Sequence, residues 1–187
     1  MSRSNSGFSL IEVLVALIIL TIGLIGIFNL HVVAKRGSYE SFQQTQAAYL
    51  ASDIINRMKL NRGQLVSYAG TYTGGLSVPP VSCDVAVGAN VVCDNAQTQA
   101  WDLYQWESLF TGSTEVVNNT SVGGLDNAQG CVLVDGATGE VTVIISWRGI
   151  RAVSDGSAAV AKFGQCAFTN GSDAAKRRAY EVTTVII

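Results

Sequence analysis

Residues 7–33 read GFSLIEVLVALIILTIGLIGIFNLHVV, and this stretch decides the fold. Seven mostly polar residues, MSRSNSG, lead up to it, and no Asp, Glu, Lys or Arg occurs from Val13 to Val33. As an α-helix this uncharged run is about 31 Å long at ~1.5 Å per residue, which matches the hydrocarbon core of a bilayer. The sequence therefore predicts a membrane-spanning helix over residues 8–34.

One carboxylate, Glu12, stands at the front of this apolar run. A charged side chain inside a membrane segment costs on the order of 3 kcal/mol and usually has a role. A secretory signal peptide, for which residues 32–34 (VVA) offer a cleavage site, has a shorter apolar region and no such acid. An ordinary single-pass anchor explains the length of the run but leaves Glu12 without a role.

A third interpretation accounts for Glu12. The string Gly7-Phe8-Ser9-Leu10-Ile11-Glu12 resembles the processing site of type IV prepilins and of type II secretion pseudopilins. The shared features are a glycine before the cut, an aromatic new N-terminus, a carboxylate five residues in and a long apolar run. The resemblance implies that residues 1–7 are a leader, that a prepilin peptidase cleaves after Gly7, and that Phe8 is then N-methylated.

Cleavage would create a cationic amine on Phe8, close to Glu12 along the chain. In a filament whose apolar helices are packed away from water, a carboxylate needs a partner, and the terminal amine of a neighbouring subunit is the obvious one. Attraction between these charges is strong where the dielectric is low. The hypothesis is that Glu12 sets the axial register between subunits and catalyses nothing.

The resemblance also implies a location. The chain would cross the inner membrane once, with its N-terminus cytoplasmic and residues 63–187 forming a periplasmic domain, and would later be part of a pilus on the cell surface. Charge next to the apolar run does not decide the orientation, because Arg3 precedes the run and Lys35 and Arg36 follow it.

The four cysteines, Cys83, Cys93, Cys131 and Cys166, all lie beyond the apolar run. Their even number and the lack of a C-x-x-C pair favour two disulfides in an oxidising compartment over a zinc site. Three connectivities are possible. The sequential one, Cys83–Cys93 with Cys131–Cys166, is favoured because it closes the smaller loops.

The helix is predicted to continue through residues 35–62 as an amphipathic segment ended by Gly63 as its C-cap. One stripe of this segment is expected to pack on a sheet: Tyr39, Phe42, Ala47, Leu50, Ile54 and Met58.

The remainder is predicted to be a globular domain over residues 63–187. Residues 63–92 are rich in Gly, Ser, Thr and Tyr and indicate a loop with short extended pieces. Asp94 and Gln97 form a candidate capping box for a helix that ends near Phe110. Strands are then expected over Cys131–Val134, Glu140–Arg148 and Ala179–Ile187, with clean alternation in the second. The predicted class is α+β: a long N-terminal helix packed on a C-terminal antiparallel sheet, the pilin-like architecture.

Three segments resemble PilV-type minor pilins in particular: residues 50–58, 101–109 and 130–147. The function that this implies is a minor pilin that helps to initiate or cap a type IV pilus. Its expected partners are the prepilin peptidase, other minor pilins, the major pilin and the inner membrane. Two alternatives stay open, a minor pseudopilin of type II secretion and an adhesin displayed at a filament tip through the loop over residues 62–92.

No enzyme chemistry is expected. The only histidine, His31, lies at the end of the apolar run, and no phosphate-binding loop, metal site or cofactor site is recognisable. The acidic residues Asp84, Asp94, Asp126 and Asp135 stand next to turn signals, so turn and cap roles account for them. A net charge of −2, with one short basic cluster at residues 176–178, argues against nucleic acid as a partner.

Overall fold

The computed structural model describes residues 7–84, 92–118, 120–121, 123–152, 160, 162–166, 168 and 171–187. The chain divides into two units, Met1–Ser41 and Phe42–Ile187, which are treated separately below.

The first unit is helical from its tenth residue. Helix α1 (Leu10–Leu60) begins in this unit, and its apolar side chains are exposed along the whole run that the sequence singles out. In the described residues, α1 is the one helix whose length and composition suit a membrane span. The absence of proline between Leu10 and Leu60 leaves the backbone hydrogen bonds of this helix uninterrupted.

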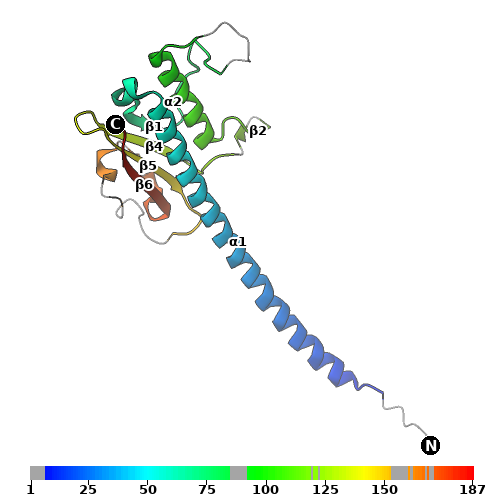
Figure 1. Ribbon diagram of the computed structural model, residues 1–187. Helices are drawn as coiled ribbons and strands as arrows, with labels where there is room; N and C mark the ends of the chain where they lie inside the picture. Colours follow the sequence, from blue (N-terminus) through cyan, green and yellow to red (C-terminus); the bar gives the residue numbers. More distant parts are fainter. Residues whose placement is uncertain are drawn as a thin grey trace, which may run out of the picture. The chain divides into compact units, whose positions relative to one another are not determined.

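The second unit is built on a four-stranded antiparallel sheet (Figure 1). Across the sheet the order is β1, β4, β5, β6, so that β5 is central and β1 and β6 form the edges. The strands are β1 (Gly70–Tyr72), β4 (Gln129–Asp135), β5 (Glu140–Arg148) and β6 (Arg177–Val185). A 3₁₀ helix, η1 (Arg62–Tyr68), joins α1 to β1, and η3 (Phe163–Gln165) and η4 (Gly171–Lys176) lie between β5 and β6.

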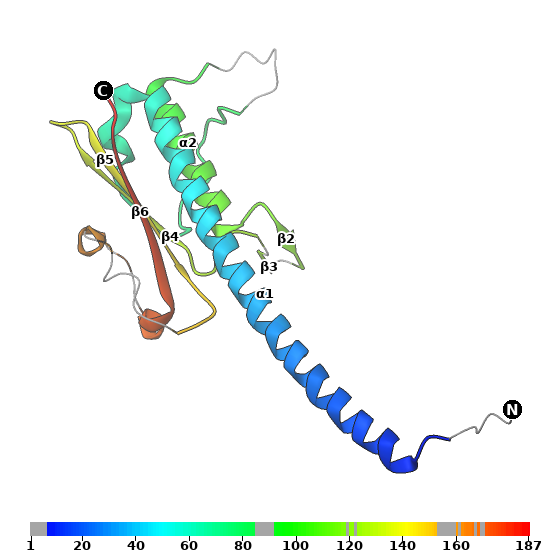
Figure 2. The same ribbon diagram turned by 60° about the horizontal axis from the view of Figure 1, so that its bottom comes forward.

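Two helices cover one face of this sheet. Figure 2 shows helix α2 (Asn95–Thr111) beside the second half of α1, with the sheet on the same side of both. Their buried side chains form one apolar core with the facing residues of β4 and β5. On α1 the buried residues are Gln43, Ala47, Leu50, Ala51, Ile54, Ile55 and Met58. This confirms the predicted α+β arrangement of a long helix on an antiparallel sheet.

Strand β5 is buried on both faces. Val141, Val143, Ile145 and Trp147 point to the helices, as their alternation in the sequence predicts. On the opposite face Ile144 packs with Cys131, Phe163 and Cys166. The segment around η3 therefore covers the second face of the sheet, and the domain has an apolar layer on each side of its central strand.

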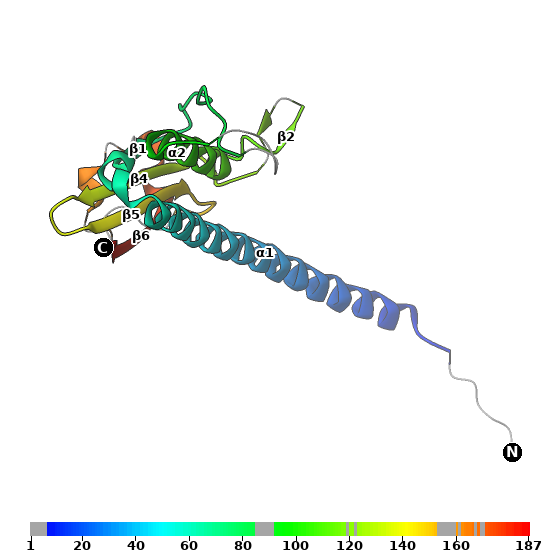
Figure 3. The same ribbon diagram turned by 45° about the horizontal axis from the view of Figure 1, so that its top comes forward.

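The boundaries of α2 follow from its caps. The Asp94 carboxylate accepts a hydrogen bond from the Gln97 amide at 2.7 Å, and the Gln97 side chain accepts one from the Asp94 amide at 3.0 Å. This is the predicted capping box. At the other end Gly112 takes the left-handed conformation with φ of 68° and ends the helix. A small hairpin follows, formed by β2 (Val116–Val117) and β3 (Thr120–Ser121) apart from the main sheet (Figure 3); the sequence analysis does not predict it.

Two expectations about α1 are wrong. Gly63 is not the C-cap, because α1 ends at Leu60 and Gly63 lies inside η1 without a positive φ. Asn61 makes the turn instead, with its side-chain amide donating to the Asn95 carbonyl at 2.7 Å. Phe42 is 63% exposed and Tyr39 44% exposed, so the stripe that packs on the sheet begins at Gln43. Phe42 and Tyr39 follow the same helical spacing but precede the part of α1 that packs on the sheet.

A polar cluster joins α1 to α2 beside the apolar core. The Arg57 guanidinium donates to Asp53 at 2.9 Å and to Asp102 at 3.0 Å, and the Tyr68 hydroxyl donates to Asp102 at 2.7 Å. Burial by itself would lower the pKa of Arg57, but the attraction and hydrogen bonds of Asp53 and Asp102 outweigh it and raise that pKa. Because each charge has a partner, the cluster fixes the helices without leaving an unpaired ion.

The first prediction concerns Gly130, where β4 passes under α2. A Cβ atom here would lie 2.6 Å from Cη2 of Trp106 and 3.3 Å from Cε1 of Phe110. Gly130→Ala should lower the free energy of unfolding by about 1–3 kcal/mol, because these rings have no room to move. Gly164→Ala, with nothing within 4 Å of its Cβ, is the matched control and should change little. Denaturant unfolding of both variants gives the comparison, and equal stabilities would contradict the packing described.

The second prediction concerns alkaline pH. Burial, aided by the negative Glu107, raises the pKa of Tyr72 to about 12, and burial also raises that of Tyr68. The unfolded chain ionises first, near its ordinary pKa of 10.0, so stability is intact below that pH and is lost as pH rises toward about 12. Unfolding free energies measured across this range should fall steeply, and less steeply in Tyr72→Phe. A profile that is flat across this range would contradict the burial of both hydroxyls.

Candidate functional site

The candidate processing site precedes the helix. Gly7, Phe8 and Ser9 are exposed and lie outside α1, and the Phe8 side chain is 90% exposed. A Cβ atom added at Gly7 would meet nothing within 4 Å. Exposed backbone outside a helix and next to a glycine is accessible to a protease. The rest of the predicted leader, residues 1–6, lies outside the described residues.

Glu12 lies in the first turn of α1. Its carboxylate accepts a hydrogen bond from the Ser9 backbone amide at 2.9 Å, and the Ser9 carbonyl accepts one from the Glu12 amide at 3.1 Å. A carboxylate at this position accepts a hydrogen bond from an amide that has no partner within the helix. Its negative charge also interacts favourably with the positive, N-terminal end of the helix dipole. In the single chain Glu12 therefore stabilises the start of its own helix.

The surface around Glu12 is apolar and shallowly hollowed. A depression of about 330 Å³ is lined by Ile11, Glu12, Val15, Ala16 and Ile19. An exposed carboxylate at the rim of an apolar depression suits a cationic group that is attached to an apolar body. Glu12 therefore lies among apolar side chains of α1, whereas Gly7 and Phe8 lie before the helix begins.

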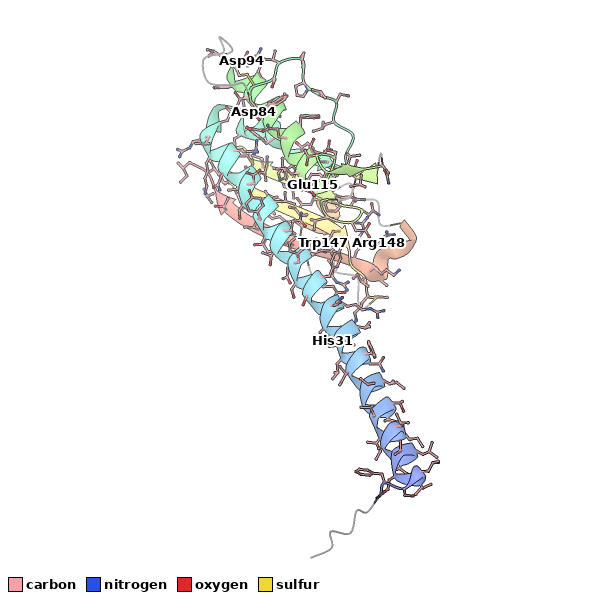
Figure 4. All side chains as sticks on the ribbon, turned by 90° about the vertical axis from the view of Figure 1, so that its right-hand side faces the viewer. His31, Asp84, Asp94, Glu115, Trp147 and Arg148 are labelled. Carbon is pink, nitrogen blue, oxygen red and sulfur yellow. A yellow bond between two sulfur atoms is a disulfide. The ribbon has the colours of Figure 1, made fainter. Side chains whose placement is uncertain are left out.

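Exposed apolar side chains continue along α1 as far as Val33. Soluble monomers rarely expose a contiguous apolar surface of this extent, which marks contact with lipid or with protein. His31 is on this part of the helix (Figure 4).

Both disulfides are present and join the sequential pairs, Cys83–Cys93 and Cys131–Cys166. The second is buried between β4 and the segment around η3, where it holds that segment on the outer face of the sheet. The first lies at the surface, before α2. No cysteine is free, so these residues have structural roles.

The acidic residues near turns have local roles. Asp94 caps α2, Asp84 accepts from the Gln105 amide at 3.2 Å, and Asp135 accepts from the Ala137 amide at 2.9 Å. For Asp135, hydrogen bonds from the Ala137 amide and from Thr138 hold the pKa of the carboxyl below its ordinary value. Asp126 pairs with Arg148 at 2.8 Å. Three of these residues, Asp84, Asp94 and Arg148, are labelled in Figure 4.

In the described part of the chain, His, Cys, Asp and Glu form no group that could hold a metal ion.

Glu107 has a role that the sequence analysis does not identify. It is buried on α2, and its carboxylate accepts from the backbone amides of Gly74 at 2.8 Å and Leu76 at 2.7 Å. It therefore holds the loop after β1 against α2. The only sequence signal is a charged residue next to Trp106 on the apolar side of an amphipathic helix.

Trp101 does not join the core with Trp106. It is half-buried, its ring is 5.7 Å from that of Tyr104, and both rings line an open groove of about 420 Å³ along α2. On α2 the contact with the core is made by Leu103, Trp106 and Phe110, and Trp101 contributes to the surface.

Comparison with known protein families gives a match at the N-terminus. The prokaryotic N-terminal methylation motif matches residues 2–28. No curated protein and no solved structure matches the chain. The N-terminus thus carries the N-methylation motif of prokaryotic prepilin-type proteins, and the motif supports a structural subunit of the pilin or pseudopilin type. It implies processing by a prepilin peptidase and assembly with other pilins, and, together with the long apolar helix, it is consistent with membrane anchoring.

The third prediction compares the disulfides. The cysteines are 35 residues apart in Cys131–Cys166 and 10 apart in Cys83–Cys93. Loop entropy alone assigns about 4 kcal/mol to the longer loop and about 3 kcal/mol to the shorter. Replacing Cys131 and Cys166 together by alanine should therefore lower the free energy of unfolding more than replacing Cys83 and Cys93. The burial of Cys131 and Cys166 should increase this difference. Unfolding free energies in denaturant test this order, and the reverse order would contradict it.

The fourth prediction concerns processing. The chain isolated from membranes should have the mass of residues 8–187 plus one methyl group. Gly7→Val should leave the leader attached, because a branched side chain stands where the peptidase must approach the backbone. Gly23→Ala, with open space around its Cβ, should be processed as the wild type is. Intact-mass spectrometry distinguishes these forms, and a wild-type chain that begins at unmethylated Met1 or at Lys35 would refute the assignment.

Proposed function

We propose that this chain is a minor pilin of the PilV type, a structural subunit that helps to initiate or cap a type IV pilus. The observation that carries the proposal is the N-terminal methylation motif over residues 2–28, followed by an apolar helix with exposed side chains. The antiparallel sheet domain, closed by two disulfides, supports a role outside the cytoplasm.

Processing and assembly follow one sequence in this proposal. A prepilin peptidase removes residues 1–7 and methylates Phe8, while the apolar part of α1 holds the chain in the inner membrane with its N-terminus cytoplasmic. Extraction into a filament transfers that apolar surface from lipid to the helices of the major pilin and other minor pilins. The sheet domain is then displayed on the pilus.

Glu12 sets the register in this transfer. Within the described residues its carboxylate accepts a hydrogen bond from the Ser9 amide, and it is one of the exposed residues that line the apolar depression. The methylated amine of a neighbouring subunit is cationic and is followed by an apolar chain, so it suits both parts of this surface. Pairing of the two charges offsets the cost of excluding Glu12 from water.

A minor pseudopilin of type II secretion is the principal alternative, because the motif at residues 2–28 is common to both systems. The segments that resemble PilV-type pilins favour the pilus.

The fifth prediction tests the function directly. Deletion of the gene should remove surface pili and twitching and leave exoprotein secretion unchanged. Complementation with the wild-type gene should restore pili, whereas Glu12→Ala and Glu12→Gln should restore few, since both lack the charge.

One result decides between the two systems, and another tests the role of Glu12. Normal pili with lost secretion would assign the chain to the pseudopilins. Full complementation by Glu12→Ala would refute the registry role and leave the pilin assignment standing. Glu40→Ala, on the same helix beyond the apolar run, is the control for general effects of removing a carboxylate.

A further inference from the structure

Strand β6 is a long edge strand. It pairs with β5 over nine positions, from Arg148↔Arg177 to Glu140↔Val185, and in the described residues no strand pairs with its other edge. The labels β1, β4, β5 and β6 follow one another across the sheet in Figure 1, with β6 last. An edge of this length is a template for a further strand unless it is covered or blunted.

The register determines which backbone groups of β6 face away from β5. The Ile186 amide donates to the Gly139 carbonyl at 2.9 Å, and the Gly149 amide donates to the Lys176 carbonyl at 2.9 Å. Both pairs belong to the register of the β5–β6 ladder. In an antiparallel ladder the hydrogen-bonded pairs alternate, so the even-numbered residues of β6 direct their N–H and C=O groups toward β5.

The odd-numbered residues therefore direct their backbone groups to the free edge. Four of them, Ala179, Glu181, Thr183 and Val185, present an N–H and a C=O each, and no hydrogen bond to these groups is found within the described residues. The edge has little of the usual protection: β6 contains no proline, and Glu181 is the only charged residue from Ala179 to Val185.

The side chains beside this edge indicate what would fit there. On the helix side Tyr180 and Val182 are only half-buried at the margin of the core. On the outer side Glu181 lies between Ala179 and Thr183, and in the described part of the chain no ion pair involves it. A strand added at this edge would cover Tyr180 and Val182 on the helix side of the sheet. On the outer side it would place one of its residues next to the Glu181 carboxylate.

We propose that β6 binds an extended strand of a neighbouring subunit, which extends the sheet by one strand. The partner strand has apolar residues at alternate positions, facing the side of Tyr180 and Val182, and a Lys or Arg next to Glu181. Backbone hydrogen bonds supply the affinity and these side chains supply the specificity. The proposal rests on the proposed function for the identity of the partner as a pilus subunit.

A second copy of this chain is a poor partner for the same edge. Pairing β6 with β6 in parallel register places Glu181 beside Glu181, and so does antiparallel pairing centred on that residue. Like charges at neighbouring positions of a sheet are destabilising. These two registers disfavour a second copy, and the proposal commits to a different subunit as the partner.

The first test is residue-resolved amide hydrogen exchange of the full chain in detergent micelles. The amides of Tyr180, Val182 and Thr184 should exchange slowly, since they bond to β5, and those of Glu181 and Thr183 should exchange fast. Equally slow exchange at Glu181 and Thr183 would show that another part of the chain covers the edge and would overturn the proposal.

The second test uses filaments sheared from cells that carry variants of the chain. Thr183→Pro removes an outward N–H that β5 does not use, and proline is tolerated at such a position. Thr183→Ala is the matched control: it also removes the hydroxyl, which lies 2.9 Å from that of Thr142, but it keeps the N–H. The recovery of Thr183→Pro in filaments should be at least about tenfold below that of Thr183→Ala, because the added strand loses one backbone donor, leaves its own carbonyl unpaired and meets the proline ring at the edge.

The outcomes separate this proposal from the proposed function. Equal recovery of both Thr183 variants would overturn the strand-addition proposal alone. Absence of the wild-type chain from filaments would contradict the proposed function and, with it, the identity of the partner. If the melting temperature of Thr183→Pro in micelles is well below that of Thr183→Ala, the test is made with Glu181→Lys and Glu181→Gln instead. Reversal of the charge in Glu181→Lys should reduce recovery in filaments more than its removal in Glu181→Gln. Equal recovery of these two variants would overturn the proposal.

Discussion

The indole of Trp106 is the contact on which the domain depends. Its N–H donates to the Leu50 carbonyl of α1 at 2.8 Å, and its ring meets Tyr72 and Phe110 edge to face with centroids 5.5 and 5.0 Å apart. One fully buried side chain of α2 thus contacts the long helix and β1, and it requires the space left by Gly130 on β4. Such edge-to-face contacts add to the energy of burial. The positions of α1, α2 and the sheet follow from this constraint.

Much of the fold could be predicted because it follows local rules. The apolar run of α1, the capping box at Asp94 and the alternation along β5 each depend on neighbours in sequence. The errors lie where tertiary contact decides. Phe42 follows the spacing of the buried stripe and is nevertheless exposed, and Gly63 is a good helix stop that is not used, because Asn61 finds partners on α2 and η1. Glu107 could not be predicted, since the amides that it accepts from belong to a loop about thirty residues away.

The candidate site was the easiest part to find and depends least on the fold. Gly7, Phe8 and Glu12 stand in one short string, and the motif is read from their order alone. What the sequence could not indicate is the state of Glu12 in the single chain, where the Ser9 amide holds its carboxylate. Under the proposed function, assembly gives this carboxylate an intermolecular cationic partner in addition to the Ser9 amide.

The cluster around Arg57 has a mechanical consequence. A pull along the axis of α1 in the second unit acts parallel to its interface with the sheet and with α2, so the load is shared among many contacts at once and does not peel them apart one by one. Arg57 reaches across to Asp102, and Trp106 reaches back to Leu50, so that sliding in either direction strains a directed bond as well as apolar packing. The disulfide between Cys131 and Cys166 fixes the opposite face of the same sheet covalently. The domain is thereby suited to bear tension applied through its helix.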